Sequence, residues 1–186
     1  MKPRLIGLTG YVGSGKSLAA NHLLPHGYIR TRYAVVLKMM LKTLGLSNAE
    51  VDGHLKEQPC ALLGGKTPRH AMLTLGTEWG RQMIDWDIWV RALMRHVDQY
   101  RADPLNTKGI VIDDVRFANE AQAIKDRGGV IWRIDRPGVG QGSCHISETG
   151  QSEIVPDLII VNDGDKCKLA ESVLTALYFA GEAKNE

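Results

Sequence analysis

Short apolar runs alternate along this chain with longer segments in which apolar residues recur every three or four positions. The apolar runs predict five short strands, at Arg4–Thr9, Tyr28–Arg32, Gly109–Asp113, Val130–Asp135 and Asp157–Val161. Periodicity and end signals predict helices over Lys16–Leu24, Tyr33–Leu44, Asn48–Lys56, Thr67 to about Met83, Asp87–Tyr100, Ala118–Arg127 and Lys166–Phe179. Alternating strands and helices are typical of an α/β protein with a parallel sheet and crossover helices.

Two segments interrupt this alternation within what we predict to be a single domain over 1–186. The first, at about 35–100, is mostly helical and lies between the early and middle strands, where a second substrate could bind. The second, at about 136–153, is rich in glycine and poor in apolar residues. A loop of that length in a compact domain is typical of a lid or of a disordered segment.

The predicted helix from Thr67 carries two glycines four residues apart, Gly76 and Gly80, on the face that also holds Arg69. A glycine inside a helix costs about 1 kcal/mol relative to alanine, so the pair indicates that something approaches the backbone closely. A neighbouring helix and a ligand both satisfy this requirement. The nearby Arg69 and Arg81 favour an anionic ligand.

The first predicted strand leads into Gly10-Tyr11-Val12-Gly13-Ser14-Gly15-Lys16-Ser17, which has the form G-x-x-x-x-G-K-S. Between a strand and a helix, this pattern indicates a loop whose backbone N–H groups bind phosphate. Lys16 can reach the β- and γ-phosphates, and the Ser17 hydroxyl can bind Mg²⁺. A coincidental match is expected in on the order of one percent of chains this long. The loop therefore predicts nucleotide binding.

A second polar group follows the buried strand at Gly109–Asp113, where Asp113, Asp114 and Arg116 come close together in sequence. Ligands of open α/β sheets bind at this edge, so these side chains should lie near the phosphate loop. A carboxylate there can hold Mg²⁺ or orient an acceptor oxygen, and an arginine can bind phosphate as a planar fork. Either aspartate could take the metal role, and a surface ion pair is the alternative interpretation.

The lid candidate brings further charged residues, Arg133, Arg136, His145 and Glu148. An arginine on a mobile element can neutralise charge in a phosphoryl-transfer transition state, and Arg136 is best placed for this. Arg133 lies inside a predicted strand, where pairing with a carboxylate is the simpler role. A single histidine such as His145 is more often structural than catalytic.

Composition narrows the class of protein. The net charge of +2 gives no support for a nucleic-acid coat or a basic membrane arm. No apolar run approaches 18 residues, and the N-terminus runs straight into the first strand, so we expect neither a membrane helix nor a signal peptide. The three separated cysteines, Cys60, Cys144 and Cys167, indicate reduced thiols in a cytoplasmic protein. We expect no membrane association and no stable nucleic-acid binding.

Several blocks besides the phosphate loop are informative when taken together. They are Pro68-Arg69, Leu75-Gly76-Thr77-Glu78-Trp79-Gly80-Arg81, Asp87-x-Trp89-Val90, Asp113-Asp114-Val115-Arg116-Phe117-Ala118-Asn119-Glu120-Ala121, Arg136-Pro137-Gly138, His145-x-Ser147-Glu148 and Val161-Asn162-Asp163-Gly164. With the phosphate loop, these blocks resemble the deoxynucleoside monophosphate kinases of tailed bacteriophages. The resemblance implies an adenylate-kinase-like P-loop fold with a five-stranded parallel sheet, a helical acceptor-binding insertion and a short lid. It also implies ATP with Mg²⁺ as the donor, a deoxynucleoside monophosphate (dNMP) as the acceptor, and a possible homodimer.

Carried over by position, the resemblance implies four groups of site residues. The ATP-binding group is Gly10, Gly13, Ser14, Gly15, Lys16, Ser17, Asn162 and Gly164, the last two near the adenine. The dNMP-binding group is Lys38, Arg69, Gly76, Thr77, Trp79, Gly80, Arg81, Asp114, Arg116 and Glu120. The catalytic group is Lys16, Asp114, Arg116 and Arg136, and the metal ligands are Ser17 and Asp114. The segment Ala34–Lys38 departs from the family pattern because it lacks a proline, which bears on substrate preference.

The leading hypothesis is a kinase that converts ATP and a dNMP into ADP and a deoxynucleoside diphosphate. Two alternatives remain: a P-loop kinase of another small acceptor, such as dephospho-coenzyme A or phosphomevalonate, and a nucleotide-dependent switch. A GTPase would carry Asn-Lys-x-Asp, whereas this chain has Asn162-Asp163-Gly164-Asp165. Base selection rests on a few side chains, and Trp79, Trp86, Trp89 and Tyr100 are candidates for either stacking or the core.

Overall fold

A computed structural model describes residues 4–139 and 153–182 of the chain. It divides into two compact units. The sheet unit comprises Met1–Arg32 and Gln99–Glu186, and the helical unit comprises Tyr33–Asp98. The helical unit covers most of the insertion predicted at about 35–100.

The sheet unit is built on five parallel strands in the order β2-β3-β1-β4-β5. The strands are β1 (Leu5–Thr9), β2 (Tyr28–Thr31), β3 (Gly109–Ile112), β4 (Val130–Asp135) and β5 (Leu158–Val161). All five lie within a residue or two of the predicted apolar runs. The predicted five-stranded parallel sheet is therefore confirmed.

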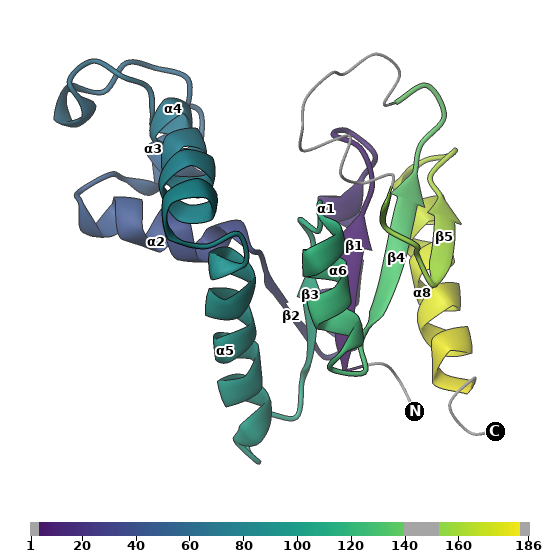
Figure 1. Ribbon diagram of the computed structural model, residues 1–186. Coiled ribbons are helices and arrows are strands. Elements are labelled where there is room, and N and C mark those ends of the chain that lie inside the picture. Colours follow the sequence, from purple (N-terminus) through teal and green to yellow (C-terminus); the bar gives the residue numbers. More distant parts are fainter. Residues whose placement is uncertain (1–3, 140–152, 183–186) are drawn as a thin grey trace. The chain divides into compact units, whose positions relative to one another are not determined.

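Helices cover both faces of this sheet (Figure 1). On one face, α1 (Lys16–Leu23) and α8 (Lys166–Glu182) pack against each other and against the strands. On the other face, α6 (Ala118–Lys125) packs on β1 and β4. The main core lies between this helix pair and the sheet. The helices α1 and α8 contribute Ala19, Ala20, Leu23, Leu169 and Val173, and the strands contribute Ile6, Leu8, Val111, Trp132, Ile134 and Ile160. A single 3₁₀ turn, η1 (Leu24–His26), ends the first helix.

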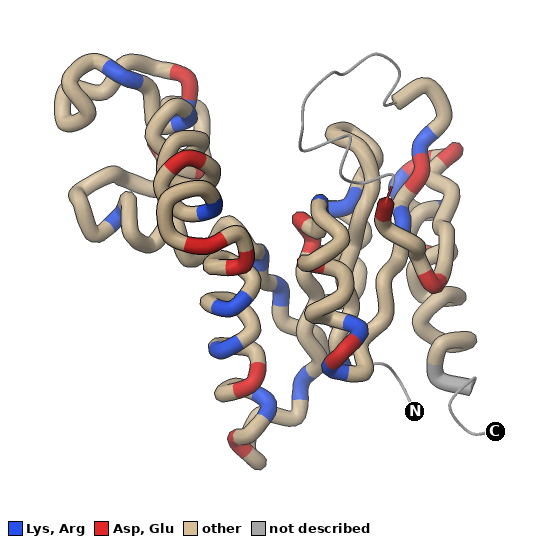
Figure 2. Tube along the Cα trace, viewed as in Figure 1, with Lys and Arg blue, Asp and Glu red and all other residues tan. Residues whose placement is uncertain are grey.

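Two of the three inner strands, β1 and β3, are wholly buried and carry no charged residue (Figure 2). Charged and polar side chains instead follow the strands at their carboxyl ends. Arg32 comes after β2, Asp113 after β3, Arg136 after β4 and Asn162 after β5, and the phosphate loop follows β1. Because the strands are parallel, all of these residues reach one edge of the sheet, the edge at which such folds bind ligands.

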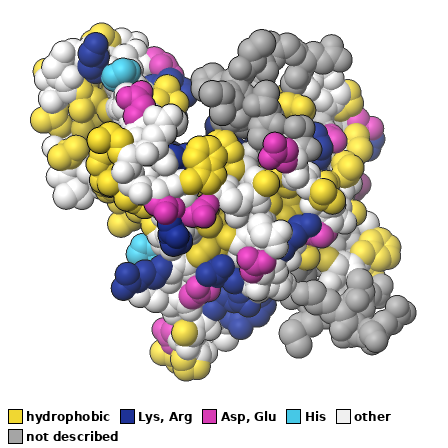
Figure 3. Space-filling view, viewed as in Figure 1, with side chains coloured by type: hydrophobic (Ala, Val, Ile, Leu, Met, Phe, Trp, Pro, Cys, Tyr) yellow, Lys and Arg dark blue, Asp and Glu magenta, His cyan; other side chains and the backbone are white. Residues whose placement is uncertain are grey.

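The helical unit contains α2 (Ala34–Thr43), α3 (Asn48–Val51), η2 (Ala61–Leu63), α4 (Pro68–Leu73), the π-helix η3 (Thr74–Ile84) and most of α5 (Ile88–Ala102). Its small core joins Leu41, Leu46 and Val51, with Leu63, Ala71, Met72 and Leu75 packed around them. Apolar side chains also show at its surface (Figure 3), and Met83 is 75% exposed.

Two of the predicted helix starts in this unit, at Asn48 and at Thr67, are confirmed by their caps. Ser47 and Glu50 form a capping box at α3, and the Thr67 hydroxyl accepts the His70 N–H at 3.1 Å at the start of α4. The prediction that α3 continues to Lys56 was wrong, because the helix ends at Val51. Just beyond it the chain turns through Gly53, and the Leu55 N–H bonds back to the Ala49 carbonyl.

No helix in the part of the chain that the structure describes combines the length and the apolar character that crossing a membrane requires.

Candidate nucleotide site

The phosphate loop between β1 and α1 requires its glycines. Gly10 has φ 135° and Gly15 has φ 103°, a region that residues with a Cβ rarely adopt. There is also no space for a side chain, since a Cβ on Gly15 would lie 2.5 Å from the Asn162 amide nitrogen. The strand and the helix thus hold a backbone loop whose shape depends on glycine.

The polar side chains of the loop suit phosphate binding. The Lys16 ammonium donates to the Gly10 carbonyl at 2.6 Å and to the Tyr11 carbonyl at 2.8 Å, so it lies over the loop. Ser14 is 1% exposed, and its hydroxyl finds no hydrogen-bond partner among the described residues. Together with the first turn of α1, these groups offer donors to an anion.

The Ser17 hydroxyl in the first turn of α1 donates to the Asp113 carboxylate at 2.9 Å. Asp113 is buried at 3% exposure, and the neighbouring Asp114 is half-buried. The residue that reaches Ser17 is therefore Asp113, one position before the aspartate predicted as a metal ligand. Hydroxyl and carboxylate oxygens are ligands that Mg²⁺ accepts, and together they fit a cation that takes its other ligands from phosphate and water.

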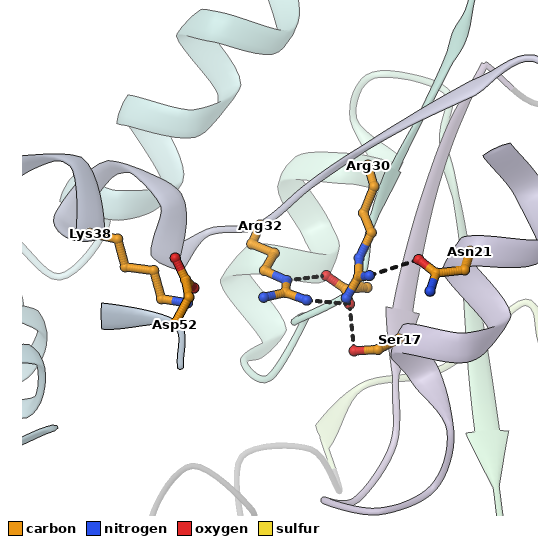
Figure 4. Close-up of polar contacts among 7 residues, drawn as sticks. Ser17, Asn21, Arg30, Arg32, Lys38 and Asp52 are labelled. Carbon is orange, nitrogen blue, oxygen red and sulfur yellow. Dashed lines mark hydrogen bonds and ion pairs between the residues drawn. The ribbon is translucent and has the colours of Figure 1, made fainter. Parts of the chain in front are cut away.

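Two arginines of the β2 end converge on the same carboxylate (Figure 4). Arg30 donates to Asp113 Oδ2, and Arg32 donates to Oδ1 at 2.8 Å and to Oδ2 at 3.4 Å. Burial raises the pKa of Asp113, but the hydrogen bonds and charges of Arg32 and Arg30 outweigh burial and hold that pKa below its ordinary value of 3.8. Asp113 is thus an ionised carboxylate in a buried position.

Sequence reasoning missed these two arginines. The available signal was their place at the end of a strand, which is the argument that singled out Asp113 and Arg116. Arg30 lies within β2, and Arg32 follows it by one residue. Without the strand order, nothing indicates that β2 lies beside β3.

Asn162, at the end of β5, supports the phosphate loop. Its side-chain amide donates to the Ser14 carbonyl at 2.8 Å, and its backbone N–H donates to the Asp135 carbonyl at 2.7 Å. The residue is 7% exposed. This supporting contact was not anticipated from the sequence, and the adenine contact expected of Asn162 and Gly164 stays a prediction.

The residues around α6 divide into buried and exposed ones. The Glu120 carboxylate is buried and accepts the N–H groups of Arg116 at 2.7 Å and of Phe117 at 3.2 Å, so it caps the helix start. The Arg116 side chain is exposed beyond β3. The dNMP contacts expected of Glu120 and Arg116 stay predictions.

The lid candidate begins after β4. Arg133 pairs with Asp135 at 3.0 Å, as its strand position indicated, and Arg136 is exposed in the turn that follows. Val139 lies within van der Waals range of a Cβ on Gly13, so the segment after β4 begins against the phosphate loop. The rest of the predicted lid, with His145 and Glu148, lies outside the described residues.

In the helical unit, the two glycines of η3 predicted that a neighbouring group approaches the helix backbone closely. That group is the side chain of Trp89. Its indole N–H donates to the Gly76 carbonyl at 2.7 Å, and a Cβ on Gly80 would lie 2.5 Å from its ring. Trp89 is 3% exposed, so it belongs to the core. The close approach is explained by a side chain of a neighbouring helix, and the dNMP contacts expected of Gly76 and Gly80 stay predictions.

The other predicted acceptor residues in this unit are either positively charged or exposed to solvent. Lys38 pairs with Asp52 at 2.5 Å (Figure 4), and Arg69 pairs with Glu57. The guanidinium of Arg81 lies 5.4 Å from the ring centroid of Trp86, whereas Thr77 and Trp79 are exposed. Burial lowers the pKa of Lys56, and repulsion by Lys38 and Arg69 lowers it further. Several positive charges therefore share a small region of the helical unit.

Comparison with known proteins agrees with this geometry. Residues 65–173 match the family model described as deoxynucleotide monophosphate kinase. A protein of Acanthamoeba polyphaga mimivirus named "Putative deoxynucleotide monophosphate kinase" is 35% identical over 178 residues, covering 86% of this chain and 88% of the relative. The deoxynucleotide monophosphate kinase of Enterobacteria phage T4 is 26% identical over 110 residues, covering 59% of this chain and 44% of the phage protein.

Among solved structures, TT1252 from Thermus thermophilus superposes with a TM-score of 0.52 at 18% identity, covering 96% of this chain and 98% of the other. At that identity the likeness concerns the fold alone. The family match includes the segment that follows β3 and the whole segment from η3 to α5. This chain therefore belongs to the deoxynucleotide monophosphate kinase family.

Proposed function

We propose that this kinase transfers the γ-phosphoryl group of ATP to the 5′-phosphate of a deoxynucleoside monophosphate, giving ADP and a deoxynucleoside diphosphate. The observation that carries the proposal is the Ser17–Asp113 contact of 2.9 Å, which joins the phosphate loop to the end of β3 in a member of this family. That contact places a hydroxyl and a carboxylate beside the loop that would hold the donor phosphates.

The donor would be held by the sheet unit. The backbone N–H groups of the loop, the Ser14 hydroxyl and the start of α1 would bind the phosphates, and Lys16 would leave the carbonyls of Gly10 and Tyr11 for the phosphate oxygens. A positively charged ammonium beside these oxygens offsets the charge that phosphoryl transfer spreads over them. Asn162 and Gly164 would lie near the adenine.

Mg²⁺ would be held by Ser17 and Asp113, and we assign the carboxylate ligand to Asp113 rather than Asp114 because of the contact with Ser17. When bound, the ion neutralises phosphate charge and orients the phosphate oxygens. Asp114, half-buried at the same strand end, would then orient the acceptor. Little base catalysis is needed, since the acceptor phosphate is already an anion.

The acceptor would bind in the region 35–100, within a single kinase domain, through Lys38, Arg69, Thr77, Trp79 and Arg81. The cations of that region suit a nucleoside monophosphate, whose phosphate carries up to two negative charges. Arg116 would lie between donor and acceptor, and Arg136 would act from the lid region at about 136–153. We also propose that the protein forms a homodimer and acts in the cytoplasm.

The decisive experiment is a coupled assay of ADP release with ATP and Mg²⁺, run separately with dAMP, dCMP, dGMP, dTMP and the matching ribonucleotides. ADP release should depend on an added dNMP, and the panel would show the preference for base and sugar. The Lys16→Ala variant should lose most turnover while its circular dichroism spectrum stays that of the parent. Release that is equally fast without any acceptor, or an unimpaired Lys16→Ala variant, would refute the assignment.

A further inference from the structure

Asp113 is bound by more cations than its own charge requires. Its side chain is 1% exposed and accepts hydrogen bonds from Arg30, Arg32 and Ser17. One guanidinium suffices to neutralise one carboxylate, and the second leaves this trio of charged side chains with a net positive charge beside the phosphate loop. Burying the Asp113 charge is costly unless it is paired, which accounts for one cation on this carboxylate, whereas a second cation beside the phosphate loop can serve an anionic ligand.

The two arginines are held differently. Arg30 bridges two elements, donating to Asn21 of α1 at 2.8 Å and to Asp113, and its side chain is 20% exposed. Its Nε is buried with no hydrogen-bond partner among the described residues. Arg30 is thus fixed between α1 and the end of β3.

Arg32 is bound to Asp113 by a fork of two contacts, and its side chain is 36% exposed. A planar guanidinium matches the two oxygens of a carboxylate and those of a phosphate equally well. An arginine that sits on a carboxylate in this way can exchange it for a phosphate without a change in the kind of contact.

A purely structural role explains the arrangement less well. Strands β2 and β3 are already joined by a parallel ladder that runs from Tyr28 opposite Gly109 to Thr31 opposite Ile112, and Arg30 adds a side-chain bridge to α1. A second arginine on the same carboxylate adds little to this join. It does add a cation at the edge of the sheet where the phosphate loop lies.

We propose that Arg32 is a phosphate-binding residue, held on Asp113 until a nucleotide phosphate takes its guanidinium, and that Arg30 is the positioning residue that keeps the Asp113 carboxylate close to Ser17 afterwards. The inference rests on the proposed kinase function, because that function supplies the phosphates and the Mg²⁺ that would bind Asp113. The phosphate is either that of the donor or the 5′-phosphate of the acceptor.

The test measures equilibrium binding by titration calorimetry. ATP without metal, ATP with Mg²⁺ and the preferred dNMP are titrated separately into the parent and into Arg32→Met. Hydrogen bonds to charged groups predict a loss of about 10- to 100-fold in affinity for the ligand whose phosphate Arg32 contacts. Weaker ATP binding identifies the donor phosphate, and weaker dNMP binding identifies the acceptor phosphate. Unchanged affinity for both ligands would overturn the role of Arg32.

Arg4→Met is the matched control, because Arg4 precedes β1 at the opposite edge of the sheet and its side chain donates to the Asn106 carbonyl. It makes the same change of net charge and should bind both ligands as the parent does. An equal loss in the control would mean that net charge is responsible and would overturn the inference. Should Arg32→Met fail to fold, Arg32→Lys keeps the cation without the fork, and parent-like affinity in that variant would contradict the proposal.

The positioning role of Arg30 has its own readout. Arg30→Lys keeps a positive charge but cannot bridge Asn21 and Asp113 with a planar fork. It should reduce the gain in ATP affinity that Mg²⁺ provides by several-fold while leaving metal-free ATP binding unchanged, whereas a merely structural role would weaken both alike. A parent chain that binds ATP but phosphorylates no dNMP would refute the proposed function, and these binding measurements would still decide the roles of Arg30 and Arg32.

Discussion

A methyl group added at Gly80 should destabilise the helical unit, although the same change at Gly76 should not. A Cβ on Gly80 would lie 2.5 Å from Cζ2 and 2.6 Å from Nε1 of the Trp89 indole, closer than real Cβ atoms come to other atoms. The ring cannot move aside freely, because it is 3% exposed and donates to the Gly76 carbonyl. At Gly76 the nearest atom is Leu37 Cδ2 at 3.6 Å, an ordinary contact.

The expected magnitude follows from three contributions. Overpacking in a well-packed region costs about 1–3 kcal/mol. Moving the ring also weakens the hydrogen bond from the Trp89 indole, which costs about 1 kcal/mol, and replacing a helical glycine by alanine returns about 1 kcal/mol. Gly80→Ala should therefore lower the free energy of unfolding by about 1–3 kcal/mol. Gly76→Ala has only the gain in helix propensity, so its free energy of unfolding should be unchanged or higher by up to about 1 kcal/mol.

Thermal unfolding followed by tryptophan emission measures this difference, since Trp79, Trp86 and Trp89 all lie in the helical unit. For a chain of this size, 1–3 kcal/mol corresponds to a drop in Tm of roughly 2–12 °C. The reasoning is refuted if Gly80→Ala melts at or above the parent temperature, or if Gly76→Ala is the less stable of the two. The KM for the dNMP, measured in Gly76→Ala, also tests whether this face contributes to acceptor binding.

Three further changes have defined outcomes. Asn162→Ala leaves the buried Ser14 carbonyl without its amide donor, so it should lower the free energy of unfolding by about 1–3 kcal/mol and raise the KM for ATP more than that for the dNMP. Burial raises the pKa of Tyr28 to about 12, and because the unfolded phenol ionises near pH 10, stability should fall between pH 10 and 12 by about 2–3 kcal/mol. Ser47→Ala removes the capping box with Glu50 at α3 and should cost about 1 kcal/mol in urea unfolding.

Each of these predictions has a control that can contradict it. Equal KM values for ATP in Asn162→Ala and the parent would refute the supporting role of that amide. Tyr28→Phe should flatten the alkaline fall in stability, and an unchanged profile in that variant would assign the fall to other groups. Ser47→Thr keeps a capping hydroxyl and should retain most of the stability that Ser47→Ala loses.

Much of the fold could be predicted from the sequence because its signals are local. Apolar runs marked all five strands, and end signals marked the helix starts at Asn48 and Thr67, since a cap is formed by residues within one turn of each other. The phosphate loop was recognisable for the same reason, because its function depends on eight consecutive residues. The predicted end of α3 was wrong. A helix can stop where other contacts compete with its next turn, and here these are the turn at Gly53 and the ion pair of Asp52 with Lys38 of α2.

What the sequence by itself determined, then, was the order of strands and helices, the phosphate loop and the family. The tertiary structure alone decided which residues meet at the edge of the sheet. The strand order β2-β3-β1-β4-β5 brings Arg30 and Arg32 to Asp113, and it brings Asn162 to the phosphate loop. It also brings the Asp113 carboxylate to the Ser17 hydroxyl in the first turn of α1. These partners lie from 81 to 148 residues apart, so no local pattern encodes their meeting.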